Sequence, residues 1–137
     1  MISYKDLTKE QEAVICNGCG PKGGWVPVPE FFMHASCDHH DFRYWKGGSE
    51  TDRKAADLDF LIMMLKDAGY DQVKQSLAFT YWMAVRLFGS VCFHYSDRER
   101  DEKDLAIFME EYYEGLRSKR EGSGPVLSYS NCISCHG

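Results

Sequence analysis

The stretch ASCDHHDFRYW, residues 35–45, is the most informative part of this chain. It places a cysteine, two histidines and two aspartates inside a segment that is otherwise rich in aromatic side chains. Burying an imidazole or a carboxylate is costly unless the group has a polar partner. The run therefore lies either on a surface or at a site that uses these groups for chemistry.

Two helices are predicted around this stretch. The first covers residues 31–46 and ends at Gly47-Gly48. The second covers residues 52–68, follows an S-x-x-D capping box that begins at Ser49, and ends at Gly69. Helical spacing of apolar residues supports the second helix, with Leu58, Leu61, Ile62 and Leu65. The connection is short enough to pack the two helices antiparallel.

The other segments complete a single all-α domain over residues 1–137. Residues 5–15 are expected to form a short helix, and residues 17–30, with four Gly and three Pro, form a loop. A third helix, about 71–95, is apolar on nearly every face and is expected to be the most buried. Strands are expected to be few, with a short pair near residues 24–29 or 126–130.

An outer fourth helix and a tail follow. The helix is capped by Ser96 and Asp97 and reaches about Arg120, and the tail covers residues 121–137. Apolar residues of the fourth helix are predicted to face inward, namely Leu105, Phe108, Met109 and Tyr112. An aromatic stripe of the third helix is predicted to lie in the core, namely Phe79, Tyr81, Trp82 and Phe88.

Composition excludes several function classes. The formal charge of -5 argues against nucleic acid, since phosphate binding needs a positive field. No run approaches about 18 consecutive apolar residues, so no transmembrane segment is predicted. The first residues lack the basic and apolar regions of a signal peptide, so the predicted location is cytoplasmic. The alternative is a secreted chain whose leader has been removed.

The histidine-aspartate helix has the groups that a hydrolytic site needs. On a helix, His40 and Asp41 project about 100° apart, and Tyr44 lies one turn beyond His40. A carboxylate behind an imidazole, here Asp57, fixes its tautomer and stabilises the imidazolium. A glycine-rich loop upstream can offer carbonyl oxygens to a hard cation, with Asp41 as its charged ligand.

These residues resemble the phospholipase A2 superfamily, in particular its prokaryotic and phage branch. The family's C-x-x-H-D-x-x-Y motif stands here as Cys37 to Tyr44. Arg53, Asp57 and Phe60 are similar to the next conserved helix of the bacterial branch, and TYWMAVRLFG at 80–89 is similar to the one after it. The three segments follow in the family's order over residues 19–89.

The resemblance implies a Ca²⁺-dependent acyl-ester hydrolase. His40 would be the base that activates water against the sn-2 ester of a glycerophospholipid, Asp57 would orient it, and Tyr44 would brace the carboxylate. Ca²⁺ would be held by Asp41 and by the loop, with Gly20, Gly23 and Gly24. A phospholipid or small ester is the expected substrate, and the oligomeric state is left open. The alternative is a non-catalytic phage or bacterial accessory protein, or a metal-binding protein, that retains the skeleton formed by these three motif segments. The altered Gly-Pro-Lys loop favours this alternative.

Two Cys-x-x-Cys pairs lie outside this skeleton. Cys16 and Cys19 form one pair, and Cys132 and Cys135 the other. Two such pairs can make a tetrahedral four-cysteine Zn²⁺ site, with an iron–sulfur cluster or disulfides as alternatives. Cys37 and Cys92 are predicted to be buried free thiols, although Cys37 would be a bridge partner in an exported homologue. His34 and His39 are predicted to be exposed, and Asp59 is the rival of Asp57 as the partner of His40.

Overall fold

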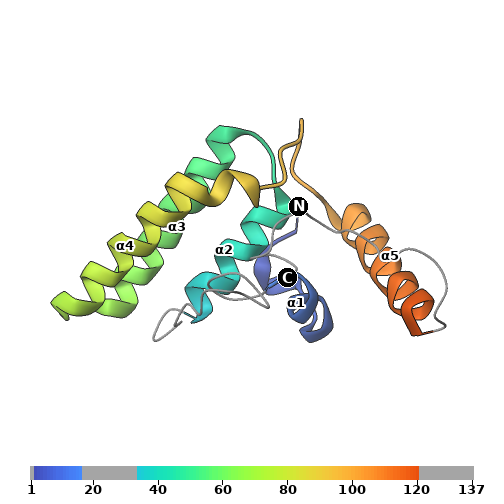
Figure 1. The fold of residues 1–137 in the computed structure, drawn as a ribbon, viewed down its shortest axis with the longest axis horizontal. Helices are drawn as coiled ribbons and strands as arrows, with labels where there is room; N and C mark the ends of the chain where they lie inside the picture. The colour runs from blue at the N-terminus through green and yellow to red at the C-terminus, as the bar shows by residue number, and fades with distance from the viewer. Residues whose placement is uncertain (1, 17–33, 121–137) are drawn as a thin grey trace.

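The computed structural model describes residues 2–16 and 34–120, and its described part is helical (Figure 1). The α-helices in these two ranges are α1 (Lys9–Ile15), α2 (His34–Lys46), α3 (Glu50–Ala68), α4 (Gln72–Phe88) and α5 (Glu102–Arg120). Two single 3-10 turns are η1 (Tyr4–Asp6) and η2 (Gly89–Val91). No strand occurs among the described residues, where one isolated bridge joins Gly48 to Tyr95. The all-α fold class is therefore confirmed.

The helices are arranged around α2. The α3–α4 hairpin packs on one side of α2, and α1 and α5 lie on the other (Figure 1). Contacts between α2 and α3 run in opposite directions along the two helices, since Tyr44 meets Asp57 and Ser36 meets Asp67. The two helices are thus antiparallel. No helix in the described ranges has the length and apolar character needed to cross a membrane.

Local capping signals set the helix boundaries. Ser49 caps α3 by accepting from the backbone N–H of Asp52, whose carboxylate accepts from Ser49 in return. This helix begins at Glu50, two residues before the predicted start, and ends at Gly69 as expected. Thr8 makes the same kind of box with Gln11, so α1 begins at Lys9 rather than near residue 5.

The fourth predicted helix begins later than expected. The carboxylate of Asp101 accepts from the backbone N–H groups of Lys103 and Asp104, so Asp101 takes the capping role assigned to Ser96 and Asp97. The segment from Ser96 is held instead by the α2–α3 turn, because the Ser96 N–H donates to the Gly48 carbonyl at 2.9 Å. This turn needs Gly47, which has φ +72° and lies against the His94 carbonyl.

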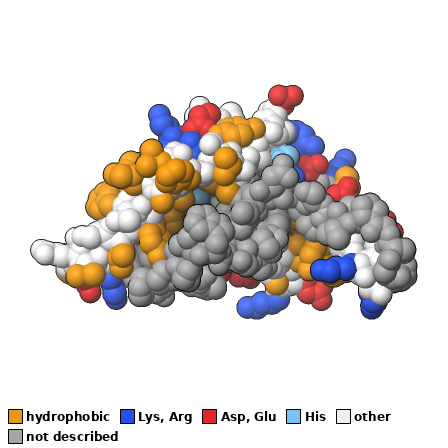
Figure 2. All heavy atoms as spheres, viewed as in Figure 1, with side chains coloured by type: hydrophobic (Ala, Val, Ile, Leu, Met, Phe, Trp, Pro, Cys, Tyr) orange, Lys and Arg blue, Asp and Glu red, His pale blue; other side chains and the backbone are white. Residues whose placement is uncertain are grey.

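The prediction that the third helix is the most buried is wrong. Among α4 residues Ala78 is the buried one, while Phe79 is 49% exposed and Phe88 71% exposed. Tyr81 and Trp82 pack partly against the α2–α3 cluster. Figure 2 shows hydrophobic side chains gathered over the α3–α4 hairpin. Among the described helices, α4 packs mainly on α3, and much of its apolar surface is exposed.

The apolar set predicted for the second helix is also partly wrong. Leu58 and Ile62 are exposed, whereas Leu61 is buried together with Phe60 and Met64. The inward face of α3 is rotated toward the side that carries Asp57, which is itself fully buried. Polar side chains thus take part in the face that meets α2.

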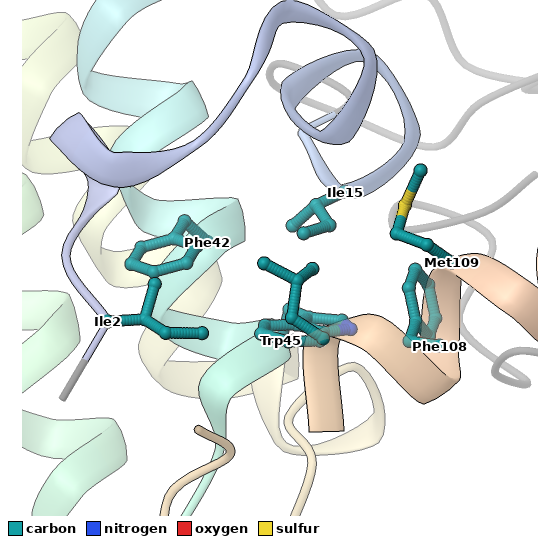
Figure 3. Close-up of a cluster of buried hydrophobic side chains, with 7 residues drawn as sticks. Ile2, Ile15, Phe42, Trp45, Phe108 and Met109 are labelled. Atoms are coloured by element: carbon teal, nitrogen blue, oxygen red, sulfur yellow. The ribbon is translucent and has the colours of Figure 1, made fainter. Parts of the chain in front are cut away.

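A second core holds α1 and α5 against α2. In Figure 3, Trp45 lies between Ile2 and Phe108, and Met109 lies beside Phe108. Leu105, Phe108 and Met109 are buried as predicted, and Tyr112 is partly buried. This core fixes the side of α2 opposite to the one that carries His40.

Candidate functional site

A buried histidine-aspartate pair joins α2 to α3. His40 Nε2 lies 2.7 Å from Asp57 Oδ1, and the two side chains are 6% and 0% exposed. An ionised carboxylate can only accept hydrogen bonds, so Nε2 carries the ring proton and Nδ1 the lone pair. This is the tautomer that a general base requires.

Tyr44 supports the same carboxylate oxygen from one turn further along α2. Its hydroxyl donates to Asp57 Oδ1 at 2.6 Å, and its ring stands 4.1 Å from that of His40. Burial and the contact with Asp57 raise the pKa of Tyr44, so its hydroxyl remains a donor. A Cβ at position 89 would lie 2.4 Å from the Tyr44 hydroxyl oxygen. The residue that follows α4 must therefore be glycine for the Tyr44 ring to fit.

Arginines hold the other oxygen of Asp57. Arg86 Nη1 donates to Oδ2 at 2.7 Å, and Arg53 Nη1 lies 3.4 Å from it. Burial raises the pKa of Asp57, but hydrogen bonds from His40, Tyr44 and Arg86 outweigh burial and bring it below its ordinary value. The buried carboxylate is therefore ionised near neutral pH.

The imidazole of His40 is neutral near neutral pH. Burial lowers its pKa below 6.5, and the bond to Asp57 opposes this shift only in part. Its ring stacks on Phe60 with centroids 4.4 Å apart. A neutral, oriented imidazole beside an ionised carboxylate can accept a proton from water and share the resulting charge.

The rival and neighbouring groups are placed elsewhere. Asp59 is 56% exposed and pairs with Arg43, so it is not the partner of His40. His39 is partly buried, rather than exposed as predicted, because its ring packs against Tyr4 with centroids 3.9 Å apart. The side chain of His34 lies outside what the structure describes.

The structure describes one of the residues predicted to bind calcium. Gly20, Gly23 and Gly24 lie outside the described residues, but Asp41 does not. Its carboxylate is one cause of the raised pKa of the Cys16 thiol, which directly follows α1. Within residues 2–16 and 34–120, no group of three His, Cys, Asp or Glu side chains is placed to hold a metal ion.

The cysteines give one correction. Cys37 and Cys92 are each disulfide-bonded, so the prediction of free thiols is wrong; sequence alone does not tell which sulfurs a fold brings within bonding reach. Cys16 has a free thiol whose pKa is raised by burial and by the carboxylates of Asp41 and Asp38. Cys19, Cys132 and Cys135 lie outside the described residues, so the four-cysteine site stays a prediction.

Sequence reasoning missed Arg86 and Glu50. Arg86 is one of two charged residues in α4, with Lys74, and it projects toward Asp57. A lone arginine in an apolar helix, four residues after Trp82 and within the motif at 80–89, is a signal that could have marked it. Glu50 gave no distinguishing signal in the sequence, because acidic residues are common in the first turn of a helix.

Comparison of the chain with family models, with curated proteins and with solved structures found no match. The resemblance to the phospholipase A2 superfamily therefore depends on the quoted motifs.

Proposed function

We propose that the protein is a Ca²⁺-dependent acyl-ester hydrolase of the phospholipase A2 type. The observation that carries the proposal is the contact of one buried carboxylate oxygen, Asp57 Oδ1, with both His40 Nε2 and the Tyr44 hydroxyl. These residues occupy the positions that the resemblance assigns to the base, its orienting acid and the bracing tyrosine. A buried ionised acid behind a neutral imidazole is costly to maintain without a use.

His40 would act through Nδ1. The lone pair there takes a proton from water as the water oxygen attacks the ester carbonyl, and the imidazolium is stabilised by Asp57. The proton then passes to the alcohol oxygen as the carbon–oxygen bond of the ester breaks. Tyr44 and Asp57 hold the ring in one orientation throughout, so little reorganisation accompanies the proton transfer.

Calcium would be held by Asp41 together with backbone carbonyls around Gly20, Gly23 and Gly24. Asp41 fits this role, because it follows His40 directly and its carboxylate acts on the pKa of Cys16, the residue after α1. Oxygen ligands of this kind suit Ca²⁺. The ion would supply Lewis-acid stabilisation of the negative charge that develops on the ester oxygen.

Fatty-acid release from mixed micelles of phosphatidylcholine tests the proposal. Activity should require Ca²⁺, disappear on chelation, and fall by about 10²- to 10⁴-fold in His40→Asn. His39→Asn is the matched control, because His39 precedes His40 on α2 and packs against Tyr4 instead of Asp57. A rate in His40→Asn equal to that of the control would refute the proposal.

A second candidate, a non-catalytic accessory protein, is favoured by the exposed apolar side chains of α4. Exposed apolar patches larger than a few hundred Å² commonly mark interaction sites. In this case calcium would cause no rise in melting temperature, and the micelle assay would show no hydrolysis. These two measurements, made on the same preparation of protein, therefore distinguish the two candidate functions.

The disulfides bear on location. Disulfides persist in oxidising compartments and are rare in the cytosol, so the bonded Cys37 and Cys92 favour the secreted alternative. Alkylation of the native protein followed by mass spectrometry should leave both residues unmodified until a reductant is added. Modification of both without reductant would return the preference to the cytoplasm.

A further inference from the structure

The Oδ2 side of Asp57 is held from α4. Arg86 Nη1 donates to Oδ2 at 2.7 Å, while Oδ1 accepts from His40 and Tyr44 at 2.7 and 2.6 Å. A carboxylate bound at both oxygens cannot rotate about its last bond without losing a hydrogen bond. The direction in which Oδ1 meets the imidazole therefore depends on the guanidinium of Arg86.

Glu50 in turn aims this guanidinium. Arg86 Nη2 lies 3.3 Å from Glu50 Oε1, and Arg53 reaches the same carboxylate with Nε and Nη2, each at 2.8 Å. The Tyr95 hydroxyl donates to Glu50 Oε2. Two acids thus balance two guanidinium groups beside the neutral ring of His40, and Glu50 closes the network from the solvent side.

We propose that Arg86 is a positioning residue, with Glu50 as its anchor, and that it fixes Asp57 in the orientation that holds His40. The catalytic consequence rests on the proposed hydrolase function, whereas the contact chain from Glu50 through Arg86 to Asp57 is a property of the folded protein. Arg86 belongs to α4, and His40 and Asp57 belong to α2 and α3. All three helices are therefore needed to orient one imidazole.

Arg86 is a better position for a test than Arg53. Arg53 is 5% exposed and donates to the Val85 carbonyl at 3.0 Å, so its loss would remove a buried side chain that joins α3 to α4 and would disturb their packing. The Arg86 side chain is 22% exposed, and water can reach the space that a shorter side chain would leave.

Two readouts on Arg86→Gln test the inference. In micelle hydrolysis, kcat should fall about 10- to 100-fold with KM within about twofold of wild type, because the base is misplaced while substrate binding is untouched. In proton NMR of the ¹⁵N-labelled protein, the hydrogen-bonded Nε2 proton of His40 should shift upfield or broaden. Arg86→Lys should give intermediate values in both, since a lysine keeps the charge but cannot bridge Asp57 and Glu50 as a fork does.

Arg117→Gln is the control, because Arg117 lies on α5 and pairs with Glu114. Glu50→Gln should change both readouts in the same direction as Arg86→Gln but less, and the double variant should show less than the product of the two rate losses. If Arg86→Gln does not fold by circular dichroism, Arg86→Lys with Glu50→Gln carries the same comparison.

The outcomes separate the two proposals. An unchanged Nε2 signal and an unchanged kcat in Arg86→Gln, with His40→Asn inactive, would overturn the positioning role and leave the hydrolase in place. A wild-type protein without hydrolysis whose Nε2 signal still shifts in Arg86→Gln would overturn the proposed function and retain the contact chain.

Discussion

Replacing Asp57 by asparagine should lower the free energy of unfolding by about 3–5 kcal/mol near neutral pH. Asp57 is fully buried and meets four donors, from His40, Tyr44, Arg86 and Arg53. Asparagine keeps one acceptor oxygen and turns the other into a donor that faces the guanidinium groups. Each hydrogen bond to a charged group contributes about 1.5–3 kcal/mol. The two bonds that are lost are those from Arg86 and Arg53 to Oδ2, and the bond from Arg53, at 3.4 Å, is the weaker.

Urea unfolding followed by circular dichroism measures this loss. Asp59→Asn is the control, since Asp59 lies two residues further along α3, is 56% exposed and pairs with Arg43. An exposed pair of this kind contributes about 0–1 kcal/mol. If Asp57→Asn is no less stable than the control, the buried carboxylate does not hold these helices together, and the account of the site given above is wrong.

Three other predictions concern stability. Because burial lowers the pKa of His40 below 6.5, the unfolded chain binds a proton at this position more readily than the folded chain does. The free energy of unfolding should therefore decline as the pH falls below about 6.5. Melting temperatures measured across this range should decline less steeply in His40→Asn than in wild type. Gly69→Ala should lower the free energy of unfolding by about 1–3 kcal/mol, because of its backbone conformation alone. Gly47→Ala should lower it more, because the new Cβ would lie 1.9 Å from the His94 carbonyl oxygen. The urea midpoints of the two variants compare these losses directly. Met64→Ala, at a fully buried position, should cost about 2–5 kcal/mol, whereas Met83→Ala, at a position 56% exposed on α4, should change unfolding by less than about 0.5 kcal/mol.

Each of these has a contrary outcome. A pH dependence identical in wild type and His40→Asn would mean that the imidazole is not held neutral by burial. Equal losses at Gly47 and Gly69 would remove the His94 contact as a constraint on the α2–α3 turn. A large loss in Met83→Ala would show that a partner or another part of the chain covers this face of α4.

The ends of α2 and α3 beside glycine were predictable because they depend on a few adjacent residues, whereas α1 and α5 begin later than predicted and α4 ends at Phe88 instead of about residue 95. The box at Ser49 and the glycines at 47 and 69 act through their own backbone and the next three residues, so their effect can be read locally. The burial of α4 was not predictable in this way. An apolar helix gives no sign of how many neighbours it has, and within the described part of the chain α4 packs mainly on α3 while Phe79 and Phe88 remain exposed.

The same distinction applies to the site. The short connection between the two helices was enough to expect Asp57 near His40, with Asp59 as a rival, whereas the contact of Tyr44 with Asp57 was expected from the resemblance. The role of Arg86 depends on where a later helix lies across α3, and that of Glu50 depends on Arg86. Contacts that require three helices to be placed at once cannot be inferred from the spacing of residues within one of them.

Tyr44 and Gly89 share one small volume, because the phenol oxygen stands where a side chain at position 89 would begin. A related chain with alanine at 89 must therefore carry a smaller residue at 44, and so give up the hydroxyl beside the acid. Substitutions at these two positions, 45 residues apart in sequence, should occur together in evolution or not at all.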